Sequence, residues 1–179
     1  MARTLKTYRA FLVEDFQKQI IEIGQRVKPF QTNFAFEKIS TGYESKFSDA
    51  NDNKVSVRFY LLKSRNPDYS GYEIDFSVNG TSFGTGRKME IKSFFSIIST
   101  VVECINRFIE KFNVSQLLIN AYDKEGKVGQ KEKIWREYVL QNITDTGFVV
   151  GRADEPGYII LQNNRIPPEK TDEKPLDIE

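Results

Sequence analysis

The first stretch of the chain carries apolar side chains at steps of three and four residues, which is the period of an amphipathic helix. The positions that form this stripe are Leu5, Tyr8, Leu12, Phe16, Ile20 and Ile23. Gly24 provides a C-terminal stop, and Pro29 follows it. We therefore predict that residues 1–30 contain a helix that packs on the rest of the domain.

From Phe34 onward the hydrophobic period changes to two, which predicts β-strands. Three stretches alternate in this way, namely 34–47, 54–64 and 72–78. Their expected inward positions are Ile39, Thr41 and Tyr43, then Val55, Val57, Phe59 and Leu61, then Tyr72, Ile74, Phe76 and Val78. Turn-forming residues separate the stretches. The pattern predicts an antiparallel meander of three strands.

A second helical stripe covers residues 91–112 and is so apolar that the helix must lie against a sheet. The short apolar run 115–122 is typical of a central strand that is covered on both faces. A short helix is expected at 131–143, and the segments 147–151 and 157–162 are expected to form a closing hairpin. A strand, a crossover helix and a further strand make a right-handed βαβ unit.

This order of elements predicts an α+β fold, with a mixed, mostly antiparallel sheet and helices on both faces. Residues 31–162 form its core. Residues 163–179 form an extended, charged tail that holds three of the six prolines. A tail of this composition cannot build a core of its own. We expect it to contact either its own domain or another protein chain.

The amino-acid composition limits the partners and the catalytic groups that can be expected for this chain. The 179 residues suit one domain, and a net charge of +1 gives no electrostatic reason to expect nucleic acid or a membrane as partner. The chain has no histidine, so the commonest general base and metal ligand are missing. Cys104 is the single cysteine, and its apolar neighbours predict a buried, inert thiol. We expect a cytoplasmic protein.

No metal site is expected. Histidine and cysteine clusters are missing from the sequence. The segment 48–54 offers oxygen ligands but lacks the glycine and the terminal glutamate of a calcium loop.

A glycine-rich loop, Thr81-Ser82-Phe83-Gly84-Thr85-Gly86, lies between the third alternating stretch and the long helix. In this position it resembles the loop of the GCN5-related N-acetyltransferase (GNAT) family, whose pattern is Arg/Gln-x-x-Gly-x-Gly/Ala. The element order of residues 5–162 is similar to that family as well. The resemblance implies a GNAT-like fold and a loop whose backbone amides bind the pyrophosphate of acetyl-coenzyme A.

The resemblance also implies site residues. If the chain is an enzyme, Thr81, Gly84, Thr85, Gly86 and Arg87 would bind the cofactor. Glu73 or Asp75 would act as the base that deprotonates an amine, and Tyr138 as the acid that protonates the leaving thiolate. Each also has a structural interpretation. The glycines permit a tight turn, the carboxylates fit a solvent-facing strand, and Tyr138 fits a packing role.

Thr81 stands where the family has Arg or Gln, which argues against catalysis. The strand meander, the apolar helix and the sequence Trp-Arg-Glu-Tyr at 135–138 are also similar to proteins encoded by tailed bacteriophages. We therefore expect a non-enzymatic protein–protein interaction module, a phage structural or assembly component in the host cytoplasm or virion, with the tail 163–179 as a candidate contact. The alternative is an acyl-coenzyme A-dependent N-acyltransferase that uses acetyl-coenzyme A.

Overall fold

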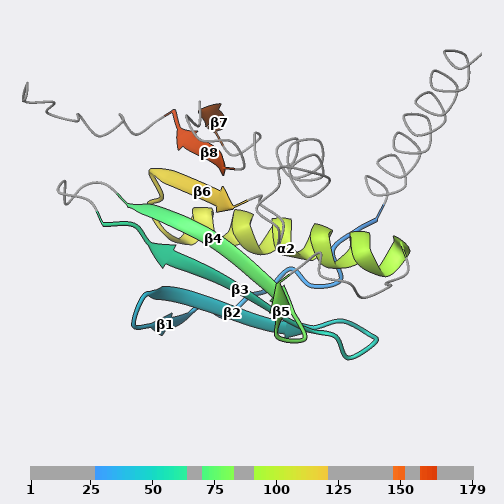
Figure 1. The fold of residues 1–179 in the computed structure, drawn as a ribbon. Coiled ribbons are helices and arrows are strands. Elements are labelled where there is room, and N and C mark those ends of the chain that lie inside the picture. Colours follow the sequence, from blue (N-terminus) through green and yellow to red (C-terminus); the bar gives the residue numbers. More distant parts are fainter. Residues whose placement is uncertain (1–26, 64–69, 83–90, 121–146, 152–157, 165–179) are drawn as a thin grey trace, which may run out of the picture.

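A computed structural model describes residues 27–63, 70–82, 91–120, 147–151 and 158–164. These residues form an eight-stranded sheet and one long helix, α2 (Figure 1). The strands are β1 (Glu37–Ile39), β2 (Gly42–Ser48), β3 (Lys54–Leu61), β4 (Gly71–Val78), β5 (Thr81–Ser82), β6 (Gln116–Asn120), β7 (Phe148–Gly151) and β8 (Tyr158–Asn163). The helix α2 spans Ile91–Lys111. The strand order is β1-β2-β3-β4-β6-β8-β7, and β5 pairs with β4 outside this path.

The predicted meander is confirmed. Strands β2, β3 and β4 pair antiparallel along their lengths. In β3 and β4, alternate residues are buried, as a period of two requires. The turn at 49–53 is also as expected: Asp49 Oδ1 accepts hydrogen bonds from the backbone N–H groups of Asn51 and Asn53, at 2.9 and 2.8 Å.

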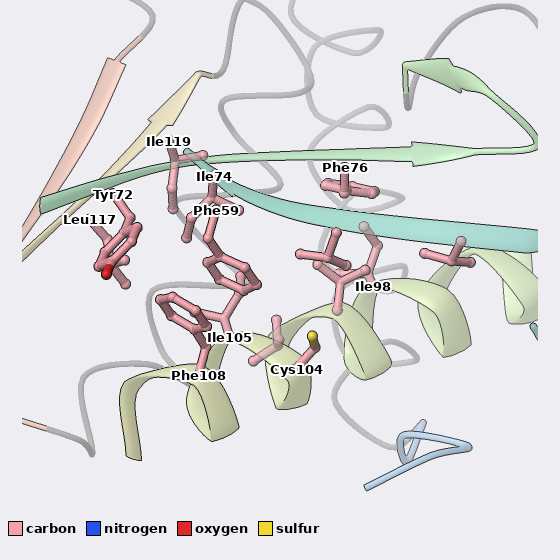
Figure 2. Close-up of a cluster of buried hydrophobic side chains, with 14 of the residues drawn as sticks. Phe59, Tyr72, Ile74, Phe76, Ile98, Cys104, Ile105, Phe108, Leu117 and Ile119 are labelled. Atoms are coloured by element: carbon pink, nitrogen blue, oxygen red, sulfur yellow. The ribbon is translucent and has the colours of Figure 1, made fainter. Parts of the chain in front are cut away.

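The helix α2 lies against one face of the sheet, and the core is the layer between them (Figure 2). Phe108 of α2 stacks on Phe59 of β3, with ring centroids 3.7 Å apart and planes 7° from parallel. Tyr72 of β4 meets the Phe108 ring edge-on at 5.0 Å. Leu117 and Ile119 of β6 extend the same apolar layer. The prediction that the long helix packs on a sheet is therefore confirmed.

The strand after α2 returns beside the strand before it. β6 pairs parallel with β4 and antiparallel with β8, so it is central in the sheet, as predicted. β7 and β8 form the predicted closing hairpin. Within the described strands, β4–β6 is the one parallel pair, so the fold is α+β with a mixed, mostly antiparallel sheet. The helices predicted within 1–30 and at 131–143 lie outside the described residues, as do residues 165–179 of the tail.

The prediction of one strand over 34–47 is wrong. The chain forms a hairpin there, in which β1 and β2 are joined by a two-residue turn. Gly42 has φ 149°, and a Cβ at this position would lie 1.9 Å from the backbone oxygen of Phe59. Only glycine fits such a close approach, so Gly42 fixes where the strand can restart. Because of the turn, Ile39 and Tyr43 do not belong to one continuous strand.

A second correction concerns Leu61, which was expected in the core. It is 56% exposed, although Tyr72, its directly opposed residue on β4, is buried.

Residues 27–36 have no strand or helix but pack firmly on the core; we call them the strap. Ser99 Oγ on α2 donates a hydrogen bond to the backbone oxygen of Val27 at 3.0 Å, and the Phe30 N–H donates to Thr100 Oγ1 at 3.1 Å. Further along, the Phe36 ring meets that of Phe108 edge-on at 5.3 Å. The strap thus follows α2 toward its C-terminal end before the chain enters the sheet.

Candidate functional site

The face of the sheet opposite α2 carries the polar half of each alternating strand. On β2, β3 and β4 we call these residues the polar face; its members are Glu44, Lys46, Ser56, Arg58, Tyr60, Glu73, Asp75 and Ser77. The antiparallel register sets them in rows across the strands, because directly opposed residues share a face. One row runs Glu44, Arg58, Asp75, and the next contains Tyr60 and Glu73.

Glu44 is the centre of an ion-pair network on this face. Its Oε1 accepts hydrogen bonds from Arg58 Nε at 2.9 Å and from Ser56 Oγ at 2.8 Å, and its Oε2 lies 2.7 Å from Lys46 Nζ. The side chain is only 8% exposed. The hydrogen bond from Lys46, followed by those from Ser56 and Arg58, outweighs the cost of burial and lowers the pKa of Glu44 from 4.5 to about 2. The carboxylate is therefore a fixed negative charge.

The predicted base candidates lie beside this network. Glu73 and Asp75 are half-buried on the polar face of β4. Glu73 lies opposite Tyr60 on one side and Leu118 on the other, whereas Asp75 lies opposite Arg58. Neither carboxylate has an ion pair or hydrogen bond within the part of the chain that the structure describes. The structure brings the two carboxylates together on one face of one strand.

Of the cofactor-loop candidates, Thr81 is the one that the structure describes. After β4 the chain turns back at Asn79 and Gly80, with φ of 52° and 75°, and Thr81 belongs to β5. Both φ values are positive, as in the two-residue turns of tight hairpins. Gly84, Thr85, Gly86 and Arg87 lie outside the described residues, as does Tyr138.

Strand β5 occupies a particular edge of β4. Ser77 and Val78 pair with β3 on one side and with β5 on the other, so β5 lies on the same edge of β4 as β6. β6 pairs with this edge only as far as Ile74. One edge of β4 therefore pairs with β6 from Gly71 to Ile74 and with β5 at Ser77 and Val78.

The turn between β4 and β5 is hydrogen-bonded to the end of the turn between β2 and β3. The Asn79 N–H donates to the backbone oxygen of Lys54 at 2.7 Å, and Asn79 Oδ1 accepts from the Lys54 N–H at 2.8 Å. Asn79 Nδ2 also donates to Asn53 Oδ1 at 3.0 Å. These bonds fix the direction in which the chain leaves β4.

Cys104 is fully buried, as predicted. Burial is the main cause that raises the pKa of its thiol to about 12, and the neighbouring Ser45 hydroxyl offsets this only in part. A thiol that is shielded from solvent and stays protonated does not act as a nucleophile.

Sequence reasoning missed the Glu44 network. Glu44, Ser56 and Arg58 were recognisable as polar positions of alternating strands, but the register that brings them together follows from the hairpin turns.

Among the residues that the structure describes, no three acidic, histidine or cysteine side chains gather as metal ligands would. In the same residues, no helix has the length and apolarity needed to cross a bilayer. The sequence matches no protein-family model and no curated protein.

Proposed function

We propose that the chain is a non-enzymatic protein–protein interaction module with a GNAT-like fold, with helices on both faces of its sheet. The strand order and the parallel crossover β4–α2–β6 support the resemblance of element order. We further propose that it is a structural or assembly component encoded by a tailed bacteriophage. The tail 163–179 is one candidate contact, because its composition favours binding over independent folding.

The observation that carries the non-enzymatic proposal is the position of β5. In the resembled family the strand leads directly into the pyrophosphate-binding loop. In this chain the strand is followed by the Asn79–Gly80 turn, and β5 runs back along β4. The loop therefore starts after a reversal of direction, and the edge of β4 that faces β6 carries the chain's own backbone. Together with Thr81 in place of Arg or Gln, this argues against coenzyme binding.

A titration with acetyl-coenzyme A tests this proposal. We expect no saturable heat in calorimetry at coenzyme concentrations up to about 1 mM, a range that reveals binding free energies near −4 kcal/mol. Affinity purification from the native source, followed by mass spectrometry, should identify protein partners. Saturable coenzyme binding together with acetylation of an amine would overturn the proposal.

One observation favours the alternative, an acyl-coenzyme A-dependent N-acyltransferase. Glu73 and Asp75 are half-buried and unpaired among the described residues, next to the end of the parallel β4–β6 pairing. Such carboxylates are suited to take a proton from an amine. If the titration shows binding, the variants Glu73→Gln and Asp75→Asn identify the base, because its loss should lower kcat by about 10²–10⁴ while coenzyme binding persists. Tyr138 would be the acid in this mechanism.

A further inference from the structure

The end of the molecule at which α2 terminates carries aromatic side chains that are only partly buried. Phe112 directly follows α2, and its ring centroid lies 4.5 Å from that of Tyr43 on β2. Phe36 of the strap meets the Phe112 ring edge-on at 5.9 Å. These three rings pack against the core without being fully covered by it. Leu61, at the end of β3, is 56% exposed at the same end, so apolar surface lies open to solvent here.

Two lysines border this apolar surface. Lys38 of β1 lies directly opposite Tyr43, so the two side chains share one face of the sheet. Lys111 Nζ lies 5.7 Å from the centroid of the Phe36 ring and 5.8 Å from that of Phe112. Both lysines are exposed, and neither forms an ion pair with another described residue. We call the following residues the end patch: Phe36, Lys38, Tyr43, Leu61, Lys111 and Phe112.

The acidic residues next to these lysines in the sequence do not neutralise them. Glu37 precedes Lys38, but it lies opposite Glu44 and therefore faces the polar side of the sheet. Glu110 precedes Lys111, but its carboxylate is bound to Arg107 at 2.8 Å. The end patch therefore combines positive charge with exposed apolar surface, and this combination suits an acidic segment that also carries apolar side chains.

The tail contains a segment of this kind. Residues 165–179 hold five acidic and three basic side chains. Four of the five acidic residues lie in the stretch 172–179, together with Leu176 and Ile178. This stretch, which we call the acidic segment, thus places aliphatic and carboxylate groups within the same few residues.

The described chain stops close to the end patch. The Asn163 backbone N–H donates to the Ser115 oxygen at 3.0 Å, and Asn163 Nδ2 donates to the Val114 oxygen at 3.1 Å, so the tail starts beside the residues that follow α2. One row of paired residues crosses four neighbouring strands and consists of Leu61, Tyr72, Leu117 and Leu161. At about 4.8 Å between strands, this row is roughly 14 Å long. Residues 165–171 can span about 23 Å when extended, so the acidic segment can reach the end patch.

We propose that the end patch is the docking site of the acidic segment of the same chain. Leu176 and Ile178 contact the apolar surface around Leu61, and the carboxylates of the segment pair with Lys38 and Lys111. The chain's own segment is favoured over a separate partner because its short tether keeps it near the patch at an effective concentration on the order of millimolar.

This docking deepens the proposed interaction role, on which it rests, by naming the surface that the tail contacts. The two can nevertheless fail separately. A chain that shows no docking and no coenzyme binding overturns the docking alone. A chain that docks its tail and also binds and uses acetyl-coenzyme A overturns the non-enzymatic role alone.

Carbodiimide crosslinking of the full chain, followed by mass spectrometry, tests the docking. The reagent joins a lysine amine to a carboxylate that is in direct contact with it. Lys92 is the internal reference, because it is an exposed lysine at the other end of α2. We expect links from Lys38 and Lys111 to the acidic segment at least fivefold more often than from Lys92. In an equal mixture of ¹⁵N-labelled and unlabelled chains, these links should join residues of the same chain.

Variants of the tail and of the patch show whether the apolar contacts matter. The double variant Leu176→Ser and Ile178→Ser should lower the yield of these links at least twofold, because two apolar contacts are lost. Leu61→Ser should have a similar effect from the side of the patch. Ile166→Ser is the matched control, since it changes an apolar residue of the same tail outside the acidic segment, and it should keep the wild-type yield.

Three results would overturn the proposal. The first is a wild-type chain that links Lys92 to the acidic segment as often as Lys38 and Lys111, or that forms no such links. The second is an unchanged yield in the double tail variant. The third is a predominance of links between labelled and unlabelled chains, which would assign the end patch to the tail of a second copy.

Discussion

The two faces of the central strands have the same backbone and opposite chemistry. Toward α2, β3 presents Val57 and Phe59 in a dry aromatic layer. On the polar face the same strand presents Ser56 and Arg58, which contact the buried carboxylate of Glu44. The difference teaches that the two faces use burial differently. On the α2 side, burial removes apolar side chains from water. On the polar face, contacts hold the buried Glu44 carboxylate in place next to partly exposed Lys46 and Arg58 side chains.

The largest expected effect is on the α2 side. Phe108→Ala should lower the free energy of unfolding by about 3–5 kcal/mol, because it removes a fully buried ring and leaves a cavity. Urea denaturation followed by circular dichroism measures the change. The neighbouring Arg107→Ala is the control, since Arg107 forms exposed ion pairs with Glu103 and Glu110, and its midpoint should move little. Equal losses in both variants would contradict this assignment of the core.

An intermediate effect is expected at Glu44. Its folded pKa of about 2 lies below the ordinary 4.5, so its contribution is complete above pH 4.5 and is lost as the pH falls toward 2. Glu44→Gln should therefore lower stability at pH 7 by roughly 1–2 kcal/mol, a figure reduced for the exposure of Lys46 and Arg58.

The same Glu44→Gln variant should also show a flatter loss of stability between pH 4.5 and 2 than the wild type. Denaturation curves at several pH values measure this slope. Glu110→Gln, an exposed change on α2 and away from the polar face, should keep the wild-type slope. If both variants follow the wild-type curve, the Glu44 network does not stabilise the polar face.

The smallest effect is expected at the unpaired carboxylates of the polar face. The double variant Glu73→Gln and Asp75→Asn should change the free energy of unfolding by no more than about 0.5 kcal/mol, because no described contact is lost. Thermal unfolding provides the measurement. A loss as large as that of Glu44→Gln would mean that these side chains are structural, and it would remove them as candidates for partner or substrate contact.

Much of this fold could be predicted because its local patterns are strong. The alternation in β3 and β4 and the stripe of α2 each identify an element without knowledge of the rest of the chain. The hairpin of β1 and β2 was missed because its turn residues, Ser40 and Thr41, are not strong turn formers. Gly42 was the available signal, but its need for a close approach to Phe59 exists only once β3 is in place.

The candidate site was harder to predict than the fold. Asn79-Gly80 is a strong hairpin signal, yet the glycines that follow it led to the interpretation of the whole stretch as a loop. The polar positions of Glu44 and Arg58 were visible, but these residues are 14 positions apart in the sequence, and their contact depends on the register between β2 and β3. Hydrophobic periodicity along the chain predicts where helices and strands lie. The contacts between side chains on neighbouring strands cannot be predicted until the turn geometry, and with it the register, is known.

The strap has a consequence for the order of folding. Its two hydrogen bonds to α2 join residues that are 72 and 70 positions apart in the sequence. Contacts of such separation close long loops. The chain loses conformational entropy on closure before the contact can stabilise it. Phe36 of the strap contacts Phe59 of β3 and Phe108 of α2, so its native contacts need α2 docked on the sheet. We therefore expect the strap to be among the last parts of the described chain to reach its native place.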